Sequence, residues 1–205
     1  MTVIKAVYTS PRKHGNTAAL QDRVIDGILD VLPDAQIERI YFVERVVIKP
    51  CTECYACMRS DGMCIIINDD YNPLREKLLS ADGILFAAPI FFYGINGKAK
   101  LFIDRCQSLW VKKYRIDGYK FGEKPFARKG FFISAGATHG KELFSGSLLT
   151  MRYFFDTFDA ELSESLLCYG LDEEEDALKN AECLTEAFEK GKSFGLALAK
   201  QAQNG

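Results

Sequence analysis

The sequence has no excess of charge of either sign. Its 26 Lys and Arg residues nearly balance its 28 Asp and Glu residues, and the formal net charge is −2. This balance provides no electrostatic basis for binding nucleic acid or an anionic membrane. Long apolar runs are also missing. No window approaches the ~20 residues of a membrane span, and the N-terminal apolar run is too short for a signal peptide. We therefore expect neither nucleic acid nor a membrane as a partner.

The cysteine content is low for a secreted disulfide scaffold, since the chain of 205 residues contains only seven cysteines. We therefore expect a cytoplasmic protein with reduced thiols. The sequence also lacks internal repeats, low-complexity linkers and any Ser/His/Asp or Cys/His pattern of a catalytic triad, so no catalytic side chain is assigned. A hydrophobic content of 48% at this length predicts one globular domain with a core of its own.

Short apolar runs alternate with amphipathic segments along the chain. The runs predict strands at 3–8, 36–42, 83–88, 130–134 and 160–168. The amphipathic segments predict helices at 17–32, 70–79 with Asp70 as N-cap, 99–110, 148–158 and 175–202. The polar stretch 111–129 is expected to be an irregular surface excursion. Five strands alternating with helices indicate a parallel sheet that is covered on both faces.

The loop after the first strand, SPRKHGNT, combines groups that suit a phosphate. Its hydroxyls Ser10 and Thr17 can donate hydrogen bonds, Arg12 adds a cation, and Gly15 allows close approach of the backbone to an anion. The helix that follows begins with unpaired N–H groups and the positive end of its dipole. The pattern is neither GxxxxGK[ST] nor GxGxxG, which favours a single phosphate group. The alternative is an ordinary helix start, capped by Asn16 or Thr17.

Two further loops follow the third and fourth strands, and the ligand edge of an open α/β sheet lies at these strand ends. Phe91, Phe92 and Tyr93 are consecutive aromatics that cannot all face the core, so they suit the wall of a flat ring system. The stretch SAGATHG at 134–140 consists of small residues that leave room for a ring. A local hydrophobic plug and a tight turn are the alternatives for these two loops.

Together, SPRKHGNT, PIFFYGINGKAKLFIDR and FFISAGATHGK resemble the flavodoxin-like NAD(P)H-dependent FMN reductases, and the cysteine segment resembles their iron–sulfur flavoprotein branch. The resemblance implies a three-layer α/β/α sandwich with strand order 2-1-3-4-5. It implies that the FMN phosphate contacts Ser10, Arg12, His14, Gly15, Asn16 and Thr17. It implies that the flavin ring lies beside Pro89, Ile90, Phe91, Phe92, Tyr93 and Gly94. It also implies that the pocket is completed by Ala135, Gly136, Ala137 and Thr138.

One departure from this family is visible, because Phe91 stands where the family usually has a tyrosine. Any hydrogen bond through that hydroxyl is lost here. The resemblance further implies a homodimer or homotetramer, with flavin pockets near the subunit contacts. His14 and His139 lie in the ligand loops, but no acid–base role is required of them, since the hydride and electron chemistry belongs to the flavin.

Four cysteines are gathered in CTECYACMRSDGMC, with the spacing C-x2-C-x2-C-x6-C. Three thiolates at three-residue intervals can converge in a compact loop, and Gly62 allows the chain to turn back and deliver the fourth. Cys51, Cys54, Cys57 and Cys64 would then supply the four ligands of a [4Fe–4S] cluster. Clusterless thiols and structural zinc are the alternatives, although zinc more often uses two separated Cys pairs. Cys106, Cys168 and Cys183 are expected to be small core residues.

The sequence thus predicts a single flavodoxin-like FMN-binding domain over 1–205, with a cysteine-rich insertion at about 50–68. The first hypothesis is a flavoprotein that moves electrons between a donor, FMN and a [4Fe–4S] cluster. The donor would be a ferredoxin-type protein or a nicotinamide nucleotide, NADH or NADPH. The second is a clusterless NAD(P)H-dependent FMN or quinone reductase, and the third is a thiol-based redox or metal sensor.

Overall fold

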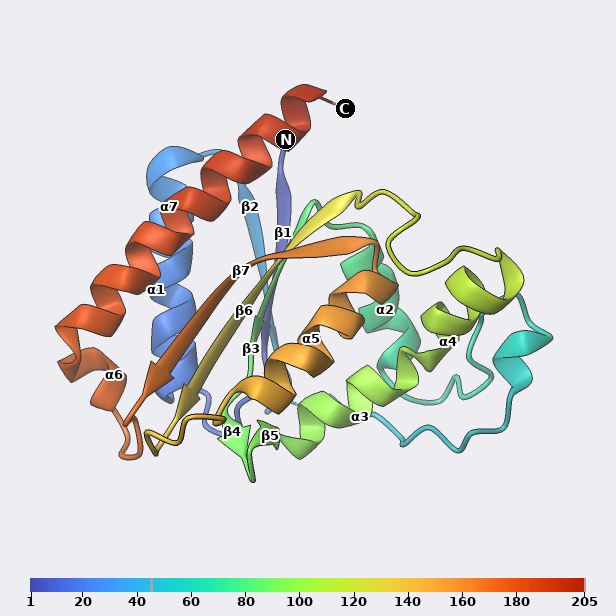
Figure 1. Ribbon diagram of the computed structural model, residues 1–205, viewed down its shortest axis with the longest axis horizontal. Coiled ribbons are helices and arrows are strands. Elements are labelled where there is room, and N and C mark those ends of the chain that lie inside the picture. The colour runs from blue at the N-terminus through green and yellow to red at the C-terminus, as the bar shows by residue number, and fades with distance from the viewer. Residues whose placement is uncertain (45, 205) are drawn as a thin grey trace.

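The computed structural model describes residues 1–44 and 46–204. Its centre is a sheet of five parallel strands in the order β2-β1-β3-β6-β7 (Figure 1). The strands are β1 Val3–Tyr8, β2 Gln36–Tyr41, β3 Gly83–Ala87, β6 Arg128–Gly136 and β7 Ala160–Tyr169. The order confirms the predicted flavodoxin-like topology 2-1-3-4-5, because β4 Ile90–Phe91 and β5 Gly94–Ile95 form a separate small hairpin.

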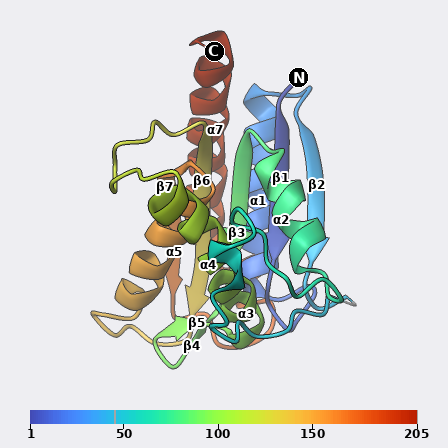
Figure 2. The ribbon, with the colours of Figure 1, turned by 90° about the vertical axis from the view of Figure 1, so that its right-hand side faces the viewer.

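Helices cover both faces of the sheet (Figures 1 and 2). Helices α1 Asn16–Val31, α6 Asp176–Lys179 and α7 Ala181–Asn204 contribute to one core. Helices α2 Tyr71–Leu79, α3 Gly97–Arg105, α4 Gln107–Trp110 and α5 Ser145–Thr157 contribute to the other. Strand β3 shows why both cores form. Its residues Leu85 and Ala87 enter the first core, whereas Ile84 and Phe86 enter the second, as the alternation of side chains along a strand requires.

Two glycines bring α1 and α7 into contact backbone to backbone. A Cβ added to Gly27 would lie 2.1 Å from the carbonyl oxygen of Phe188, and one added to Gly191 would lie 2.2 Å from that of Val24. Any larger residue at either position would push the helices apart. This contact holds α7 against α1.

No helix of the described residues is long and apolar enough to cross a membrane.

One helix start differs from the prediction, and another lies where it was predicted but without its side-chain cap. The expected helix 175–202 is divided, because Asn180 ends α6 and its side chain accepts a hydrogen bond from the Cys183 N–H at 3.0 Å, which caps α7. Asp70 occupies the predicted cap position of α2, but its carboxylate accepts a hydrogen bond from the Val47 N–H instead. Asp69 accepts a hydrogen bond from the Tyr71 N–H.

The expected surface excursion at 111–129 is wrong for its first part. Residues Val111–Ile116 continue α4 as a π-helical segment, and the Lys113 side chain is buried. Its ammonium group lies 3.1 Å from carboxylate oxygens of both Asp156 and Asp159, and the Tyr114 hydroxyl donates a hydrogen bond to Asp156. A polar sequence is therefore held inside the molecule, because its charges are paired there.

Candidate functional site

The loops after β1, β3 and β6 meet at the carboxyl edge of the sheet, at the lower side of Figure 1. They enclose a cavity of about 270 Å³. The predicted residues that line it are Ser10, Arg12, Gly15, Asn16, Thr17, Pro89, Ile90, Phe91, Ala135, Gly136 and Ala137. Pro11, Leu171 and Asp172 also line the cavity and were not predicted. The fold thus brings together three loops that lie far apart in the sequence.

Helix α1 points its N-terminus toward this cavity without a side-chain cap. Its N-cap position is Gly15, so the alternative in which Asn16 or Thr17 caps the helix is wrong. The Asn16 amide instead donates a hydrogen bond to the Glu173 carbonyl at 2.9 Å and accepts one from the Ala177 N–H at 3.0 Å. Asn16 therefore fastens the loop before α6 to the helix start. An uncapped N-terminus offers backbone N–H groups and a positive dipole end to an anion.

The first loop is ordered by its own polar atoms. The Ser10 hydroxyl accepts a hydrogen bond from the Arg12 N–H at 3.1 Å. Thr17 is buried at the base of the helix start, whereas Arg12 is exposed at the rim. The arrangement places hydroxyls and N–H groups below a cation, which is the chemistry of a phosphate site.

Three buried polar residues at the bases of these loops were missed by sequence reasoning. The Thr9 hydroxyl donates to the Ala87 carbonyl at 2.9 Å, and the Asn96 amide donates to the Thr9 carbonyl at 2.9 Å. The Ser134 hydroxyl donates to the Ala88 carbonyl at 2.7 Å. These bonds join the ends of β1, β3 and β6 to the start of α3. The Asn-Gly pair at 96–97 is a turn signal that could have drawn attention to Asn96.

The aromatic loop is divided between the cavity and the solvent. Phe91 lines the cavity, but Phe92 and Tyr93 form the turn of the β4–β5 hairpin with φ of 50° and 59°. Phe92 is fully exposed. The Tyr93 hydroxyl approaches Gly140, where an added Cβ would lie 2.6 Å from it. The predicted residues that do not line the cavity are His14, Phe92, Tyr93, Gly94 and Thr138.

The four clustered cysteines line a second cavity of about 360 Å³, together with residues of α3, α4 and the π-helical segment. The loop that carries them is sharply turned, with positive φ at Glu53, Tyr55, Asp61 and Gly62. Gly62 has φ +76°, and a Cβ there would lie 2.4 Å from the Lys112 Cβ. The turn that the sequence assigned to Gly62 therefore needs glycine for its conformation and for its close packing.

The thiols of this loop are separated rather than gathered at one point. Among residues 1–44 and 46–204, no three His, Cys, Asp or Glu side chains are close enough to hold one metal ion. A site for a single zinc ion is thus not preformed there. A cubane takes one thiolate per iron, so its four ligands surround a body larger than an ion. Four thiols around one cavity fit that donor set.

The individual cysteines differ in their surroundings. Cys51 and Cys54 are exposed, and Cys57 and Cys64 are half-buried. A hydrogen bond from the Ala56 backbone is the main cause that lowers the pKa of Cys54, whereas burial raises the pKa of Cys57. Cys106 and Cys168 are buried and Cys183 packs against the core. These last three occupy the core positions that the sequence predicted.

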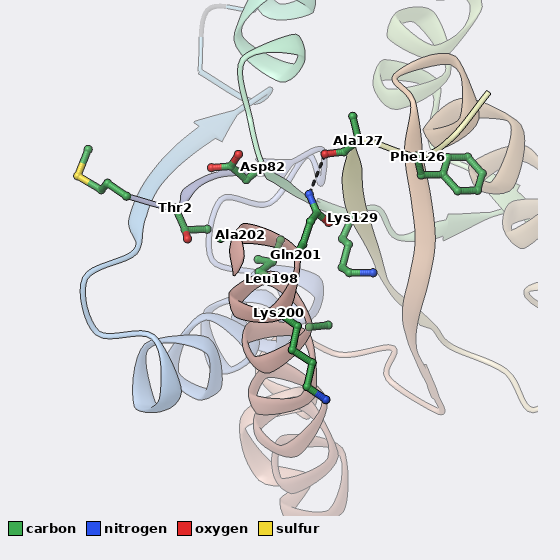
Figure 3. A pocket seen from close by; sticks show the side chains of 11 residues that line it. Thr2, Asp82, Phe126, Ala127, Lys129, Leu198, Lys200, Gln201 and Ala202 are labelled. Carbon is green, nitrogen blue, oxygen red and sulfur yellow. Dashed lines mark hydrogen bonds between the residues drawn. The ribbon is translucent and has the colours of Figure 1, made fainter. Parts of the chain in front are cut away.

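A further and larger cavity of about 870 Å³ lies at the opposite edge of the sheet (Figure 3). Its lining includes Thr2, Asp82, Lys129 and Gln201, and the Gln201 amide donates a hydrogen bond to the Ala127 carbonyl at 2.7 Å. None of the predicted site residues lines it. It has neither a helix N-terminus nor a thiol group, so the two cavities at the loops remain the candidates.

Residues 2–154 match the family described as NADPH-dependent FMN reductase. An iron–sulfur flavoprotein of Methanocaldococcus jannaschii is 32% identical over 102 residues, 50% of this chain and 50% of that protein. The chain thus spans half the length of this relative. A putative NAD(P)H-dependent FMN-containing oxidoreductase of Bacillus subtilis is 27% identical over 139 residues, 67% of this chain and 68% of that protein.

Solved structures with the same fold include an FMN-dependent NADH-azoreductase of Bacillus anthracis in complex with FMN. The TM-score is 0.62 at 12% identity, and the alignment covers 97% of this chain and 100% of that chain. At this identity the similarity concerns the fold.

Proposed function

The chain belongs to the NADPH-dependent FMN reductase family, whose members are FMN-dependent oxidoreductases, and from this premise we propose that it binds FMN at the carboxyl edge of the sheet and a [4Fe–4S] cluster in the cysteine cavity. When bound, FMN would supply hydride and electron chemistry, and a cluster would supply one-electron transfer. The chain's own contribution is to bind, orient and shield these groups.

The observation that carries the FMN proposal is the cavity at the uncapped N-terminus of α1. The phosphate would lie against the backbone of Gly15, Asn16 and Thr17, with the Ser10 and Thr17 hydroxyls as donors and Arg12 closing the rim. The Asn16 side chain is occupied by the loop before α6, so its role is to hold that loop.

The flavin ring would lie between two loops of the same cavity. Pro89, Ile90 and Phe91 form one wall, and Ala135, Gly136 and Ala137 form the other. The small residues of the second wall leave space for a flat ring. For His14, Phe92, Tyr93, Gly94 and Thr138 we propose contacts at the rim, since they belong to the loops that form the cavity but do not line it.

The cysteine cavity supports the iron–sulfur form of the proposal over a clusterless reductase. The four cysteines singled out by their spacing lie within fourteen residues, and all four line one cavity. Six relatives that match this chain at 29–32% identity, five from archaea and one from Clostridioides difficile, bear the name iron–sulfur flavoprotein. The donor would then be a ferredoxin-type protein or a nicotinamide nucleotide, and the protein would act as a homodimer or homotetramer.

The FMN site is tested by removing the rim cation. We expect Arg12→Ala to raise the Kd for FMN about 10- to 100-fold, because a charge-assisted contact to phosphate is worth roughly 1.5–3 kcal/mol. Flavin fluorescence quenching on titration with the apoprotein measures this. Lys13→Ala is the matched control, because Lys13 lies in the same loop but pairs with Glu44 and does not line the cavity. An equal change in both variants, or none in Arg12→Ala, contradicts the assignment.

The cluster site is tested by comparing two cysteines. Cys57→Ser should sharply lower the iron and sulfide of anaerobically prepared protein and leave FMN bound, because the flavin cavity is built from other loops. Cys168→Ser, in the core, should leave iron unchanged. Iron retained in Cys57→Ser would remove the cysteine loop from the proposal and move the clusterless reductase to first place.

A further inference from the structure

Arg105, the last residue of α3, is buried beside the cysteine cavity and has an ion-pair partner that the sequence does not indicate. Its guanidinium group lies 2.6 Å from the Asp69 carboxylate, and neither side chain is exposed. The neighbouring Asp104 pairs instead with Lys100 on the surface of α3. A fully buried ion pair is costly to form, so one partner without the other would be strongly destabilising. The segments that this ion pair connects are therefore of interest.

The contacts of Arg105 reach both ends of the cysteine loop. One terminal nitrogen donates to the Lys49 carbonyl at 2.9 Å, two residues before Cys51. The other donates to the Ile66 carbonyl at 2.9 Å, two residues after Cys64. Asp69 completes the connection, because its carboxylate also accepts a hydrogen bond from the Lys49 N–H at 2.9 Å. One side chain on α3 therefore ties together the two stems of the loop.

These contacts do not engage every donor of Arg105. Its Nε–H is buried and has no partner among the described residues, and Arg105 itself lines the cysteine cavity. Cys64 lines the same cavity as Arg105, so the guanidinium group and this thiol share one space. In Figure 2 the cysteine segment lies in front of α4 and of α3, the helix that ends at Arg105.

Other cations near the loop do not share this position. Arg75 also has an unpartnered Nε–H, but it does not line the cavity, and its terminal nitrogen donates to Glu76 and to the Met63 sulfur. Lys112 lies on the outer side of the loop, partly exposed and paired with Asp61 and Asp117. Among the cavity-lining residues described, Arg105 is the cation with a free donor.

We propose that Arg105 is the positioning residue of the cysteine cavity: it holds the stems of the 51–64 loop together and directs an N–H donor and a positive charge at the Cys64 side of a bound cluster. This rests on the proposed function. Donors and positive charge near cluster sulfur stabilise the reduced, more negative state and raise its reduction potential. The same residue would therefore set the geometry of the site and its potential.

The test compares Arg105→Met and Arg105→Lys with a matched arginine elsewhere. Arg128 donates to the Phe158 and Leu79 carbonyls and also has a buried, unpartnered Nε–H, but it lies outside the cysteine cavity. Arg128→Met therefore controls for the loss of a buried arginine. Each variant is measured as apoprotein by amide hydrogen exchange and, after anaerobic reconstitution with iron and sulfide, by cluster content and midpoint potential.

We expect amide exchange over residues 49–66 to be at least about tenfold faster in Arg105→Met than in the parent, since the loop opens without its tie. Cluster content should fall and the remaining cluster should have a lower potential. Arg105→Lys keeps the positive charge but loses the planar guanidinium with its several N–H donors. Its cluster midpoint potential should therefore be closer to that of the parent than its amide exchange rate in the loop. Arg128→Met should change neither. If global unfolding prevents loading of Arg105→Met, Arg105→Lys decides the comparison.

Two failures can be told apart. Parent-like exchange, cluster content and potential in both Arg105 variants would overturn the positioning role while leaving the proposed function in place. A parent protein that binds FMN but takes up no iron and sulfide would overturn the cluster proposal and with it the effect on potential. In that case unchanged loop exchange in Arg105→Met would overturn the structural tie as well.

Discussion

The Asp69–Arg105 ion pair makes a prediction about single residues. Asp69→Asn leaves the Arg105 charge buried without its partner, and both side chains are fully buried. We expect the free energy of unfolding to fall by about 3–5 kcal/mol. Asp70→Asn is the matched control, because the Asp70 side chain accepts one backbone hydrogen bond at an exposed position and asparagine can still accept it. Urea unfolding measures both variants, and equal losses would contradict the special role of Asp69.

The same carboxylate predicts a pH dependence. Burial would raise the pKa of Asp69, but hydrogen bonds from the Lys49 backbone, Arg105 and the Tyr71 backbone lower it below its ordinary value of about 3.9. A carboxylate with a lowered pKa stabilises the folded state above that ordinary value, and this contribution is lost as pH falls. The stability difference between the parent and Asp69→Asn should thus be full near pH 6–7 and shrink below about pH 4. A constant difference in urea unfolding across this range would contradict it.

At this scale the sequence predicted residues whose spacing carries the information. The short spacing between Cys51, Cys54, Cys57 and Cys64 predicted that they lie close together, and all four line one cavity, because residues a few positions apart stay near one another in the folded chain. Arg105 could not be found in the same way, because its partners Lys49, Ile66 and Asp69 lie on segments that meet it only through tertiary packing. Asn16 shows a different limit. The sequence placed it in a loop that lines the cavity, but it could not show that the Asn16 side chain is hydrogen-bonded to the Glu173 carbonyl.

At the scale of elements, the β4–β5 hairpin makes a prediction about backbone strain. Phe92 has φ 50° and is fully exposed, so its side chain packs against nothing that offsets this conformation. Because the left-handed region costs a non-glycine residue about 1–2 kcal/mol, and glycine loses some of that to chain entropy, Phe92→Gly should raise the free energy of unfolding by about 0.5–1 kcal/mol. Phe91→Gly, at a strand position, should lower it. A destabilised Phe92→Gly would mean that Phe92 has partners in solution.

The π-helical segment Val111–Ile116 makes a second prediction at this scale. Lys113→Met would leave the Asp156 and Asp159 carboxylates without their shared ammonium, at a cost of about 3–5 kcal/mol in the free energy of unfolding. Lys112→Met, the neighbouring residue with partly exposed partners, should cost at most about 1 kcal/mol. Chemical denaturation of the two variants checks the comparison, and similar values would place Lys113 at the surface.

The elements that the sequence predicted well are those with a strong apolar period. Strand β3 is a continuous buried run, and α1 buries one face along its length, so neither needed tertiary information. The prediction for 111–116 failed because its polar composition is that of a surface loop. Its burial depends on acids that lie 43 or more residues beyond Lys113 in the chain. Periodicity does not report such pairing.

At the scale of the whole molecule, the strand order followed from the family resemblance, and β2-β1-β3-β6-β7 confirms it. That order places the ends of β1, β3 and β6 side by side, which is why three separate loops form one cavity. The cysteine cavity shares no lining residue with the cavity at the carboxyl edge of the sheet. The single-domain boundary and the oligomeric state stay predictions, because neither is tested by the arrangement of one chain.

The central claim, that one chain carries both FMN and an iron–sulfur cluster, is tested most directly by counting cofactors in the parent protein prepared without oxygen. Flavin is measured after release from the protein, and iron and acid-labile sulfide are measured on the same sample. The account predicts about one FMN with about four iron and four sulfide per chain, because a cubane takes one thiolate per iron from the four cysteines. Protein that binds FMN but retains no stoichiometric iron and sulfide, even after reconstitution, would contradict the claim.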